Sequence, residues 1–218
     1  EKLVEVPPSV GSSGGIRMLL EGRADMARVA RPLSEEEAQQ GLSWRTFALA
    51  PIVFIANLPQ RCIANLNSTQ LLDIFSGRLS RWSQLGKCPD HKIYLARREG
   101  GDSSNRILNE KISGLGEIKN PAGKIIYTTP EAFQTINAHP YTLGFLPLSE
   151  VTNPKLIQFS IDGVRASPAS IKDETYGLQL PLALAWKEPL QEDAKHFLQF
   201  LNSPAAQEII SSFGTIPT

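Results

Sequence analysis

Two apolar runs that lie far apart in the chain constrain its fold most. Residues 47–56 read FALAPIVFIA and residues 178–186 read LQLPLALAW. Both runs have the composition of buried strands, and both contain an interior proline. The first is longer than an ordinary strand of about 5–6 residues. We interpret each run as a connection that passes from one sheet to another, so the chain crosses twice between two lobes.

The segments around these runs alternate between strand and helix patterns. Apolar spacing near the front predicts a strand over 2–6, a helix over 16–20 that ends at Gly22, and a strand over 24–30. Ser34 and Glu37 have the spacing of a capping box that starts another helix. Further helices are predicted over 68–75, 103–112, 130–138 and 188–213, the last broken at Ser203-Pro204, and further strands over 92–96, 124–127, 142–146 and 156–161. The alternation indicates an α/β fold whose parallel strands are joined by helices.

Two crossings divide the chain into two lobes. We expect residues 1–51 and 181–218, which include both chain ends, to form the first lobe, and residues 52–180 to form an inserted second lobe. A chain of 218 residues buries enough apolar surface to fold in this way. Small ligands usually bind in a cleft between domains and at the carboxyl ends of α/β strands, so the cleft between the lobes is the expected ligand site.

The charge balance excludes several classes of protein. The 22 Lys and Arg residues equal the 22 Asp and Glu residues in number, and no basic block stands out. Non-specific nucleic-acid binding needs a basic face, so we expect no nucleic-acid partner. No apolar stretch approaches the length of about 18 residues that crosses a membrane. The composition, 41% hydrophobic and 20% charged, is that of an ordinary globular protein.

Cys62 and Cys88 are the only cysteines. The segment between them is short enough for a disulfide to close it, and a buried, unpaired couple is the alternative. A disulfide is the expected state if the protein is exported. The chain begins at Glu1 without a signal peptide, so we expect a processed or trimmed product.

A glycine-serine loop precedes the first predicted helix, in the stretch VGSSGGIRMLL over residues 10–20. A helix N-terminus offers unpaired N–H groups and a positive dipole end, which attract an anion. Gly14 and Gly15 allow close approach, and the hydroxyls of Ser12 and Ser13 add donors. In the alternative interpretation, a serine only caps the helix and the glycines only form a turn. The loop has neither P-loop nor dinucleotide-fold spacing.

The stretch RREGGDSSN over residues 97–105 repeats this layout, because it follows a predicted strand and opens a predicted helix. Two such loops that face each other across a cleft would hold one small anion between two helix N-termini. Arg98 or Arg97 would add a charge able to make two hydrogen bonds.

Five segments resemble, in order, segments of the phosphate-binding proteins that serve ABC transporters, which are type II periplasmic binding proteins. These segments read GSSGGIRMLLEGRADMARVARPLSEEE, NSTQLLDIFSGRLSRWSQLG, IYLARREGGDSSNR, TLGFLPLSEV and GLQLPLALAW. The resemblance covers nearly the whole chain. It implies a two-lobed, hinge-closing α/β fold with two crossover strands and a ligand cleft between the lobes.

The resemblance also implies a function without catalysis, cofactor or metal. It implies an exported protein, in the periplasm or outside the cell, that captures a small tetrahedral oxyanion, phosphate above all, and delivers it to a membrane permease of an ABC transporter. Matching by position places the anion-binding groups on Ser12, Ser13 and Gly14 of the first loop and on Arg98, Ser103 and Ser104 of the second.

Two residues depart from the family pattern. The second loop of the family reads Arg-x-x-Gly-Ser-Gly-Thr, whereas Asp102 here puts a carboxylate at a helix start, where it would cap the helix and repel an anion. Ala30 stands where Ser or Asp commonly contacts the anion. Arg28 or Arg31 would supply charge nearby, or both are solvated surface arginines.

The front of the chain is a third departure. The family has a strand, an anion loop and a helix before the segment that matches residues 2–6, and none of these is present here. Loss of that strand exposes a sheet edge. We therefore expect a trimmed segment, a shortened family member, or a partner segment of another chain that covers the gap.

Two other functions compete with transport. One is a binding or sensory module of the same fold with an eroded pocket and weak or different ligand specificity. The other is a serine hydrolase, because Gly101-Asp102-Ser103 looks like a nucleophile loop. A catalytic serine needs a base within hydrogen-bond reach, and His91, His139 and His196 lie in unrelated contexts. No His or Cys pair has the spacing of metal ligands.

Overall fold

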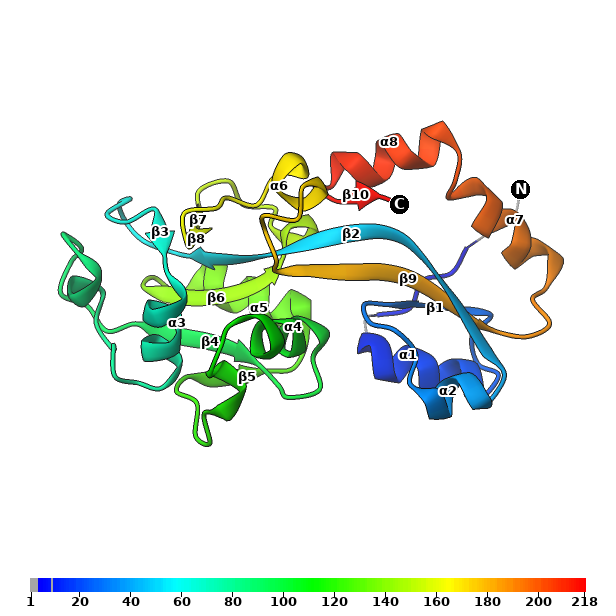
Figure 1. Ribbon diagram of the computed structural model, residues 1–218, viewed down its shortest axis with the longest axis horizontal. Coiled ribbons are helices and arrows are strands. Elements are labelled where there is room, and N and C mark those ends of the chain that lie inside the picture. The colour runs from blue at the N-terminus through cyan, green and yellow to red at the C-terminus, as the bar shows by residue number, and fades with distance from the viewer. Residues whose placement is uncertain (1–3, 9) are drawn as a thin grey trace.

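Two long strands run through the whole molecule and join its two lobes. The computed structural model describes residues 4–8 and 10–218. It is elongated, and strands β2 (Leu42–Ala56) and β9 (Gln179–Lys187) extend side by side from one lobe into the other (Figure 1). They pair antiparallel along the full length of β9, with one register shift between Thr46 and Ala48. The two apolar runs of the sequence are therefore the two crossover strands.

The sheet is mixed rather than parallel. Its order is β1, β9, β2, β6, β4, β5, and β7 and β10 also pair with β2. Strand β4 is parallel to β5 and β6, and the other pairs in this sheet are antiparallel. The remaining strands of this sheet are β1 (Met26–Val29), β4 (Tyr94–Arg98), β5 (Lys124–Ile126), β6 (Thr142–Pro147), β7 (Ile157–Gln158) and β10 (Ile216–Pro217). Two further strands, β3 (Asn65–Leu66) and β8 (Ser160–Ile161), form a separate parallel pair.

The helices begin at capping residues that are visible in the sequence. Ser34 and Glu37 form the expected capping box at α2, and Asn67 forms another with Gln70 at α3. Ser203 caps α8. The helices are α1 (Gly11–Leu20), α2 (Glu35–Gln39), α3 (Ser68–Phe75), α4 (Ser103–Lys111), α5 (Thr129–Ala138), α6 (Pro168–Lys172), α7 (Glu192–Phe200) and α8 (Pro204–Ser212).

Each lobe has its own apolar core. The larger core surrounds the second half of β2, where the rings of Phe54, Phe75 and Phe145 pack with centroids 5.6–6.4 Å apart. The smaller core lies where Ile16 and Leu19 of α1 pack on the strands of the other lobe. Separate cores allow the lobes to move relative to each other as bodies, with β2 and β9 as the connection.

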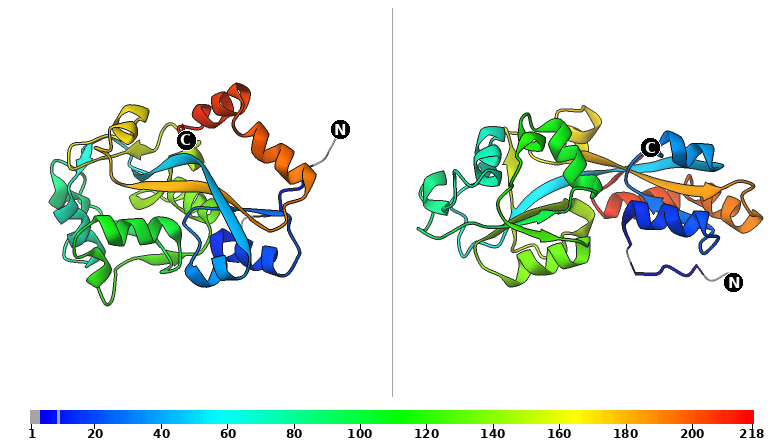
Figure 2. Two further views of the ribbon diagram at one scale, coloured as in Figure 1. Left: turned by 45° about the vertical axis from the view of Figure 1, so that its right-hand side comes forward. Right: turned by 90° about the horizontal axis from the view of Figure 1, so that it is seen from below.

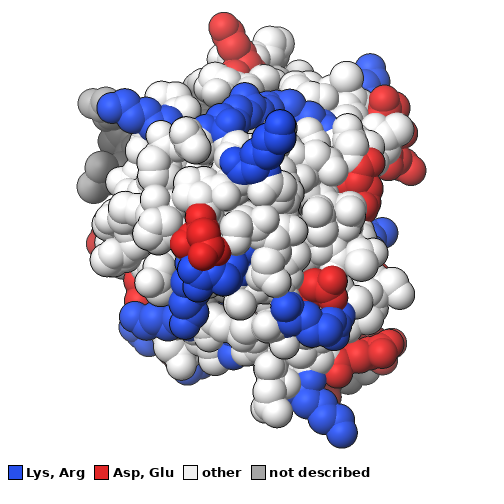
Figure 3. Space-filling view, turned by 90° about the vertical axis from the view of Figure 1, so that its left-hand side faces the viewer, with Lys and Arg blue, Asp and Glu red and all other residues white. Residues whose placement is uncertain are grey.

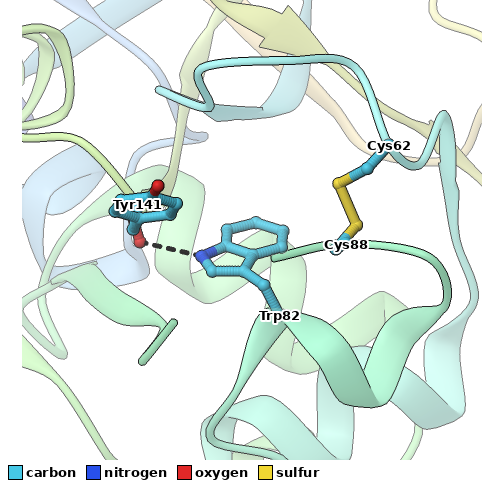
Figure 4. Close-up of a disulfide and its surroundings, with 4 residues drawn as sticks. All are labelled: Cys62, Trp82, Cys88 and Tyr141. Atoms are coloured by element: carbon cyan, nitrogen blue, oxygen red, sulfur yellow. Dashed lines mark hydrogen bonds between the residues drawn. A yellow bond between two sulfur atoms is a disulfide. The ribbon is translucent and has the colours of Figure 1, made fainter. Parts of the chain in front are cut away.

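A disulfide cross-links the larger lobe at its end away from the smaller lobe. Cys62 and Cys88 are bonded, which confirms the disulfide interpretation. Beside the bond, the fully buried indole of Trp82 donates a hydrogen bond of 3.0 Å to the carbonyl oxygen of Tyr141 (Figure 4). The cross-link spans 26 positions of sequence and reduces the freedom of the unfolded chain.

The predicted strand at the front was wrong where the structure describes it. Residues 4–8 form no strand and lie apart from the sheet (Figure 2, right), and residues 1–3 lie outside the described part. Val4 and Val6 are 62% and 82% exposed, because no neighbouring strand covers this segment. Alternating apolar residues form a stable strand only when another strand pairs with them.

Other predictions need correction in detail. The first apolar run does pass from one set of strands to another, since β2 pairs with β9 up to Pro51 and with β6 from Ile52, but both sets are joined through β2 in one sheet. The predicted strand over 156–161 is divided into β7 and β8, with the buried Phe159 between them. The helix predicted from residue 188 begins at Glu192. Strands β3 and β10 and helix α6 were not predicted, because elements of two to five residues are too short to show a period.

Charges of both signs mix at the end of the molecule that carries β3 and α3 (Figure 3). Two ion pairs lie in this region, Arg78 with Asp73 and Arg81 with Asp90, each at 2.6 Å. This face therefore offers no continuous basic surface to nucleic acid. Among the described residues, every helix is too short or too polar to cross a membrane.

Candidate functional site

The glycine-serine loop forms the first turn of α1. The helix begins at Gly11, five residues earlier than predicted, after Val10, which makes no side-chain cap. Ser12 and Ser13 lie inside the helix, so the alternative in which one of them caps it is wrong. The Ser12 hydroxyl instead accepts a hydrogen bond of 2.9 Å from the backbone N–H of Ala30. This bond fixes the start of α1 against the end of β1.

Gly14 and Gly15 allow tight packing of α1. A Cβ atom on Gly14 would lie 2.8 Å from Cβ of Val10, and one on Gly15 would lie 3.1 Å from Cβ of Ala27. Both distances are shorter than ordinary contacts, so a side chain at Gly15 would push α1 away from β1, and one at Gly14 would displace the Val10 side chain at the start of the helix. The two glycines are thus explained by packing as well as by the approach of a ligand.

The second loop starts α4 with a carboxylate cap. Asp102 accepts a hydrogen bond of 3.0 Å from the backbone N–H of Asn105, as its position at a helix start predicts. Ser103 and Ser104 follow in the first turn and are only 8% and 5% exposed. Backbone N–H groups of a first turn have no acceptor within the helix. The cap occupies one of them and leaves those of Ser103 and Ser104 to other acceptors.

The two loops meet across the lobes. The hydroxyl oxygens of Ser12 and Ser103 are 3.4 Å apart, although 91 positions of sequence separate them. The contact joins the first turn of α1 in the smaller lobe to the first turn of α4 in the larger one. The two helix N-termini therefore converge on one place, as the layout of the loops predicts.

Arg98 lies buried at the end of β4 and contacts Asp102, the residue before Ser103. Its side chain is 6% exposed, and its Nη2 donates to Asp102 Oδ2 at 2.9 Å and to the carbonyl oxygen of Tyr127 at 3.1 Å. Its Nε and Nη1 atoms are buried and have no partner among the described residues. A buried donor without an acceptor costs about 1–3 kcal/mol. The guanidinium thus has two donors available for an oxygen-rich ligand.

Asp102 has a partner for its charge. One carboxylate oxygen caps α4 and the other pairs with Arg98. Arg98 is therefore partly neutralised before any anion arrives. An incoming anion competes with this carboxylate for the guanidinium, which lowers the attraction of the site.

Arg31 belongs to the neighbourhood of the first loop, and its interpretation as a solvated surface arginine was wrong. Its side chain is 17% exposed and makes two bonds of 2.7 Å to the Glu37 carboxylate. Its Nη2 also donates to Ser13 Oγ at 3.4 Å. Arg28 is exposed on β1. The capping box of Ser34 and Glu37 was the feature of the sequence that could have indicated this ion pair, because it holds the Glu37 side chain within reach of Arg31.

The contact between Arg31 and Glu37 changes the titration of both groups. Its hydrogen bonds hold the pKa of the Glu37 carboxyl below its usual value of 4.5 and raise the pKa of Arg31 above its usual value. Burial opposes both shifts but is the weaker effect. The pair therefore stays ionised across the physiological range and keeps Arg31 at Ser13.

The surroundings of Ser103 bear on the hydrolase alternative. In the described part of the chain, the hydrogen-bond partner of the Ser103 hydroxyl is Ser12, with no histidine beside it. His91 stacks on Tyr141 at the disulfide end, with ring centroids 3.9 Å apart. No group of three or more His, Cys, Asp or Glu side chains among residues 4–8 and 10–218 is placed to hold a metal ion.

The expected cleft is closed where the two serines touch. Two hollows of about 180 Å³ each lie elsewhere, one between α1 and the end of β9 and the other beside α4. Neither is lined by Ser12, Ser103 or Arg98. The Ser12–Ser103 contact leaves no room for a ligand directly between these two hydroxyls.

Known proteins resemble the chain over nearly its whole length. Residues 2–205 match the family described as a PBP superfamily domain. The phosphate-binding protein PstS of Borreliella burgdorferi is 24% identical over 94% of this chain and 76% of its own, and PstS of Bacillus subtilis is 25% identical over 100% and 74%. A Clostridium perfringens structure with bound phosphate, described as a candidate phosphate ABC transporter substrate-binding protein, superposes with a TM-score of 0.85, at 25% identity over 96% of this chain and 85% of that chain.

We expect Glu37→Gln to lower the free energy of unfolding by about 1–2 kcal/mol at pH 7, the contribution of a charge-assisted hydrogen bond. The pKa of Glu37 is lower in the folded chain than its usual value, so the contact stabilises the fold above that usual value and is lost as the pH falls through the folded value. The free energies of unfolding of wild type and variant, measured with urea, should therefore converge as the pH falls below the usual pKa of a glutamate. The exposed neighbour Glu36→Gln is the control, and a gap that persists in acid would contradict the assignment.

Proposed function

The chain belongs to the PBP superfamily, and we propose that it is an exported solute-binding protein that captures a tetrahedral oxyanion, phosphate above all, for uptake by an ABC transporter. The observation that carries the proposal is the meeting of Ser12 and Ser103, 3.4 Å apart, together with the buried Arg98, which has two unpartnered nitrogens and pairs with Asp102, the residue before Ser103. The phosphate-binding names of two relatives and the phosphate bound in the Clostridium perfringens structure support the choice of anion.

The proposed site draws donors from both lobes. Arg98 supplies charge, and hydroxyls and first-turn N–H groups of both helices supply hydrogen bonds to the oxygens of the ligand. The proposed ligand-binding residues are Ser12, Ser13, Gly14, Arg98, Ser103 and Ser104. They form a binding site and perform no catalysis.

Binding proceeds by closure of two lobes, which we assign to residues 1–51 with 181–218 and to residues 52–180. The change of partners along β2 supports this division, because β2 pairs with β9 up to Pro51 and with β6 from Ile52 onward. The open form admits the anion, and closure brings the two serine loops around it. A membrane permease then recognises the closed form.

The Cys62–Cys88 disulfide supports a location outside the cytoplasm. Disulfides form and persist in oxidising compartments and are rare in the cytosol. The periplasm or the outer cell surface is such a compartment, and a binding protein there meets both its solute and its permease.

A further polypeptide segment completes the smaller lobe. Among the described residues, β1 pairs only with β9, so its other edge carries unpaired backbone groups. Val4 and Val6, which an added strand could cover, are exposed. Open edges of this kind attract other strands. A segment that pairs with β1 would lie next to the loop of Ser12.

The open edge predicts an exchange pattern in β1. In an antiparallel pair, alternate residues direct their backbone groups toward the neighbouring strand and away from it. We expect the outward amides of 26–29 in the isolated chain to exchange with deuterium at least about 100-fold faster than the inward ones. The measurement is hydrogen–deuterium exchange followed by NMR. Equal protection of all four amides would show that the edge is already covered.

Phosphate titration tests the binding function. By isothermal titration calorimetry, we expect phosphate to bind with micromolar or tighter affinity. Arg98→Ala should weaken binding by about 2 kcal/mol or more, about 30-fold, because it removes a charge-assisted contact. Arg17→Ala is the matched control, since Arg17 is an exposed arginine of α1. Urea unfolding of each variant checks that it folds.

Several outcomes would contradict this function. Unchanged affinity in a folded Arg98→Ala variant would remove Arg98 from the site. If the wild type binds none of phosphate, sulfate and arsenate, the alternative function, a binding or sensory module with an eroded pocket, is favoured instead. Ser104→Ala leaves the ion pair of Arg98 intact and serves as a second, milder test of the same site.

Asp102→Asn should tighten phosphate binding about tenfold, equal to about 1.4 kcal/mol. The variant removes the carboxylate charge that competes for Arg98, and asparagine caps a helix as well as aspartate does. Calorimetry at constant ionic strength measures the change. Asp162→Asn, which removes an equal charge from a loop at β8, should leave the affinity unchanged. Weaker binding in the first variant would show that Asp102 contacts the ligand favourably.

A further inference from the structure

A second hollow lies beside α4, the helix that carries Ser103, and neither Ser12 nor Ser103 lines it. It has a volume of about 180 Å³ and is bounded by α4, β4 and the 3₁₀ turn at Leu115–Glu117. Phe75, Leu115 and Ile118 give it an apolar floor, and Arg97, Asn105 and Asn109 line it with polar groups. Phe75 and Leu115 are each 3% exposed, so the floor is part of the core.

Arg97 carries a charge that no described side chain balances. Successive residues of a strand point to opposite faces, so Arg97 points away from the side that Arg98 occupies. Arg98 is paired with Asp102, whereas Arg97 makes no ion pair with the described residues. Its Nε atom is buried without a hydrogen-bond partner. A buried guanidinium nitrogen of this kind calls for an acceptor.

Two amides face the same hollow. Asn105 and Asn109 are four residues apart on α4, so their side chains share one face of the helix. Neither side-chain amide has a hydrogen-bond partner in the described part of the chain. None of the lining residues is acidic. The hollow thus offers one positive charge and two amide donors above an apolar floor.

The size of the hollow limits what it can hold. An engineered cavity of about 150 Å³ takes up one benzene molecule. A ligand with one ring or an equivalent branched chain therefore fits the apolar part, and a carboxylate fits the polar wall because it accepts two parallel hydrogen bonds from a guanidinium.

We propose that this hollow is a second ligand site, which binds a small organic carboxylate with a ring-sized apolar body. The carboxylate lies against Arg97 and the two asparagines, and the apolar body lies on Phe75 and Leu115. The site is separate from the oxyanion site at Arg98 and does not depend on its function.

Benzoate is the probe for this site. Titration of the ¹⁵N-labelled protein, followed by NMR, should show saturable shifts in residues 97–121 with a dissociation constant of about 1 mM, typical of a ligand this small. Arg97→Gln should weaken binding at least about fivefold, as expected when a charge-assisted contact is lost. Arg106→Gln is the matched control, because it removes the same charge from α4 outside the hollow.

Neutral benzamide has nearly the same shape as benzoate, so it tests whether the charge of the ligand is recognised. It should bind at least about fivefold more weakly than benzoate, because it lacks the charge that Arg97 recognises. Asn109→Asp, at an exposed position that tolerates substitution, should also weaken benzoate by placing a like charge in the hollow. The proposal is overturned by shifts that do not saturate below about 20 mM, by shifts centred elsewhere, by equal effects of the two arginine variants, or by equal binding of benzamide.

Discussion

The antiparallel pairing of β2 with β9 is the constraint on which the arrangement of the rest depends. The two strands run through both lobes, and the other strands of the main sheet extend outward from them: β1 pairs with β9, β6, β7 and β10 pair with β2, and β4 and then β5 follow beyond β6. Because the pair is continuous, it sets the distance and orientation between the two lobes, and so between α1 in the smaller lobe and α4 in the larger one. The first turns of α1 and α4 therefore meet, although they belong to different lobes and different parts of the chain.

The charges of Arg98 and Asp102 act in opposite directions on the binding of an anion. Arg98 is buried, half satisfied by Asp102 and the Tyr127 carbonyl, and half unpartnered. Without the pair, the site would keep only neutral hydroxyl and N–H donors for an anion, whereas an arginine without any partner would be costly to bury. Asp102 lowers that cost in the empty protein and also competes with the ligand. The Asp102 carboxylate therefore affects both the affinity for an anion and the stability of the fold.

Much of the local structure was predictable because local interactions decide it. The capping box of Ser34 and Glu37, the cap at Asp102 and the proline break before α8 depend on residues three or four positions apart. The start of α1 was predicted five residues late, because the bond that holds Ser12 comes from Ala30, 18 positions away. The strand predicted over 2–6 was wrong for the residues described, because a period of two does not provide a partner strand.

Local patterns were enough to predict the two crossover strands, the alternating α/β order, and the glycine-serine and aspartate-serine stretches at which two helices begin, because periodicity and capping are short-range properties. The tertiary structure alone decided that Ser12 and Ser103 touch, that Arg98 is buried against Asp102 while Arg97 faces a separate hollow, and that Arg31 holds Glu37 beside Ser13. These contacts join distant residues or depend on which face of a strand is buried. Pairing and burial arise from the packing of the whole chain, which no local pattern contains.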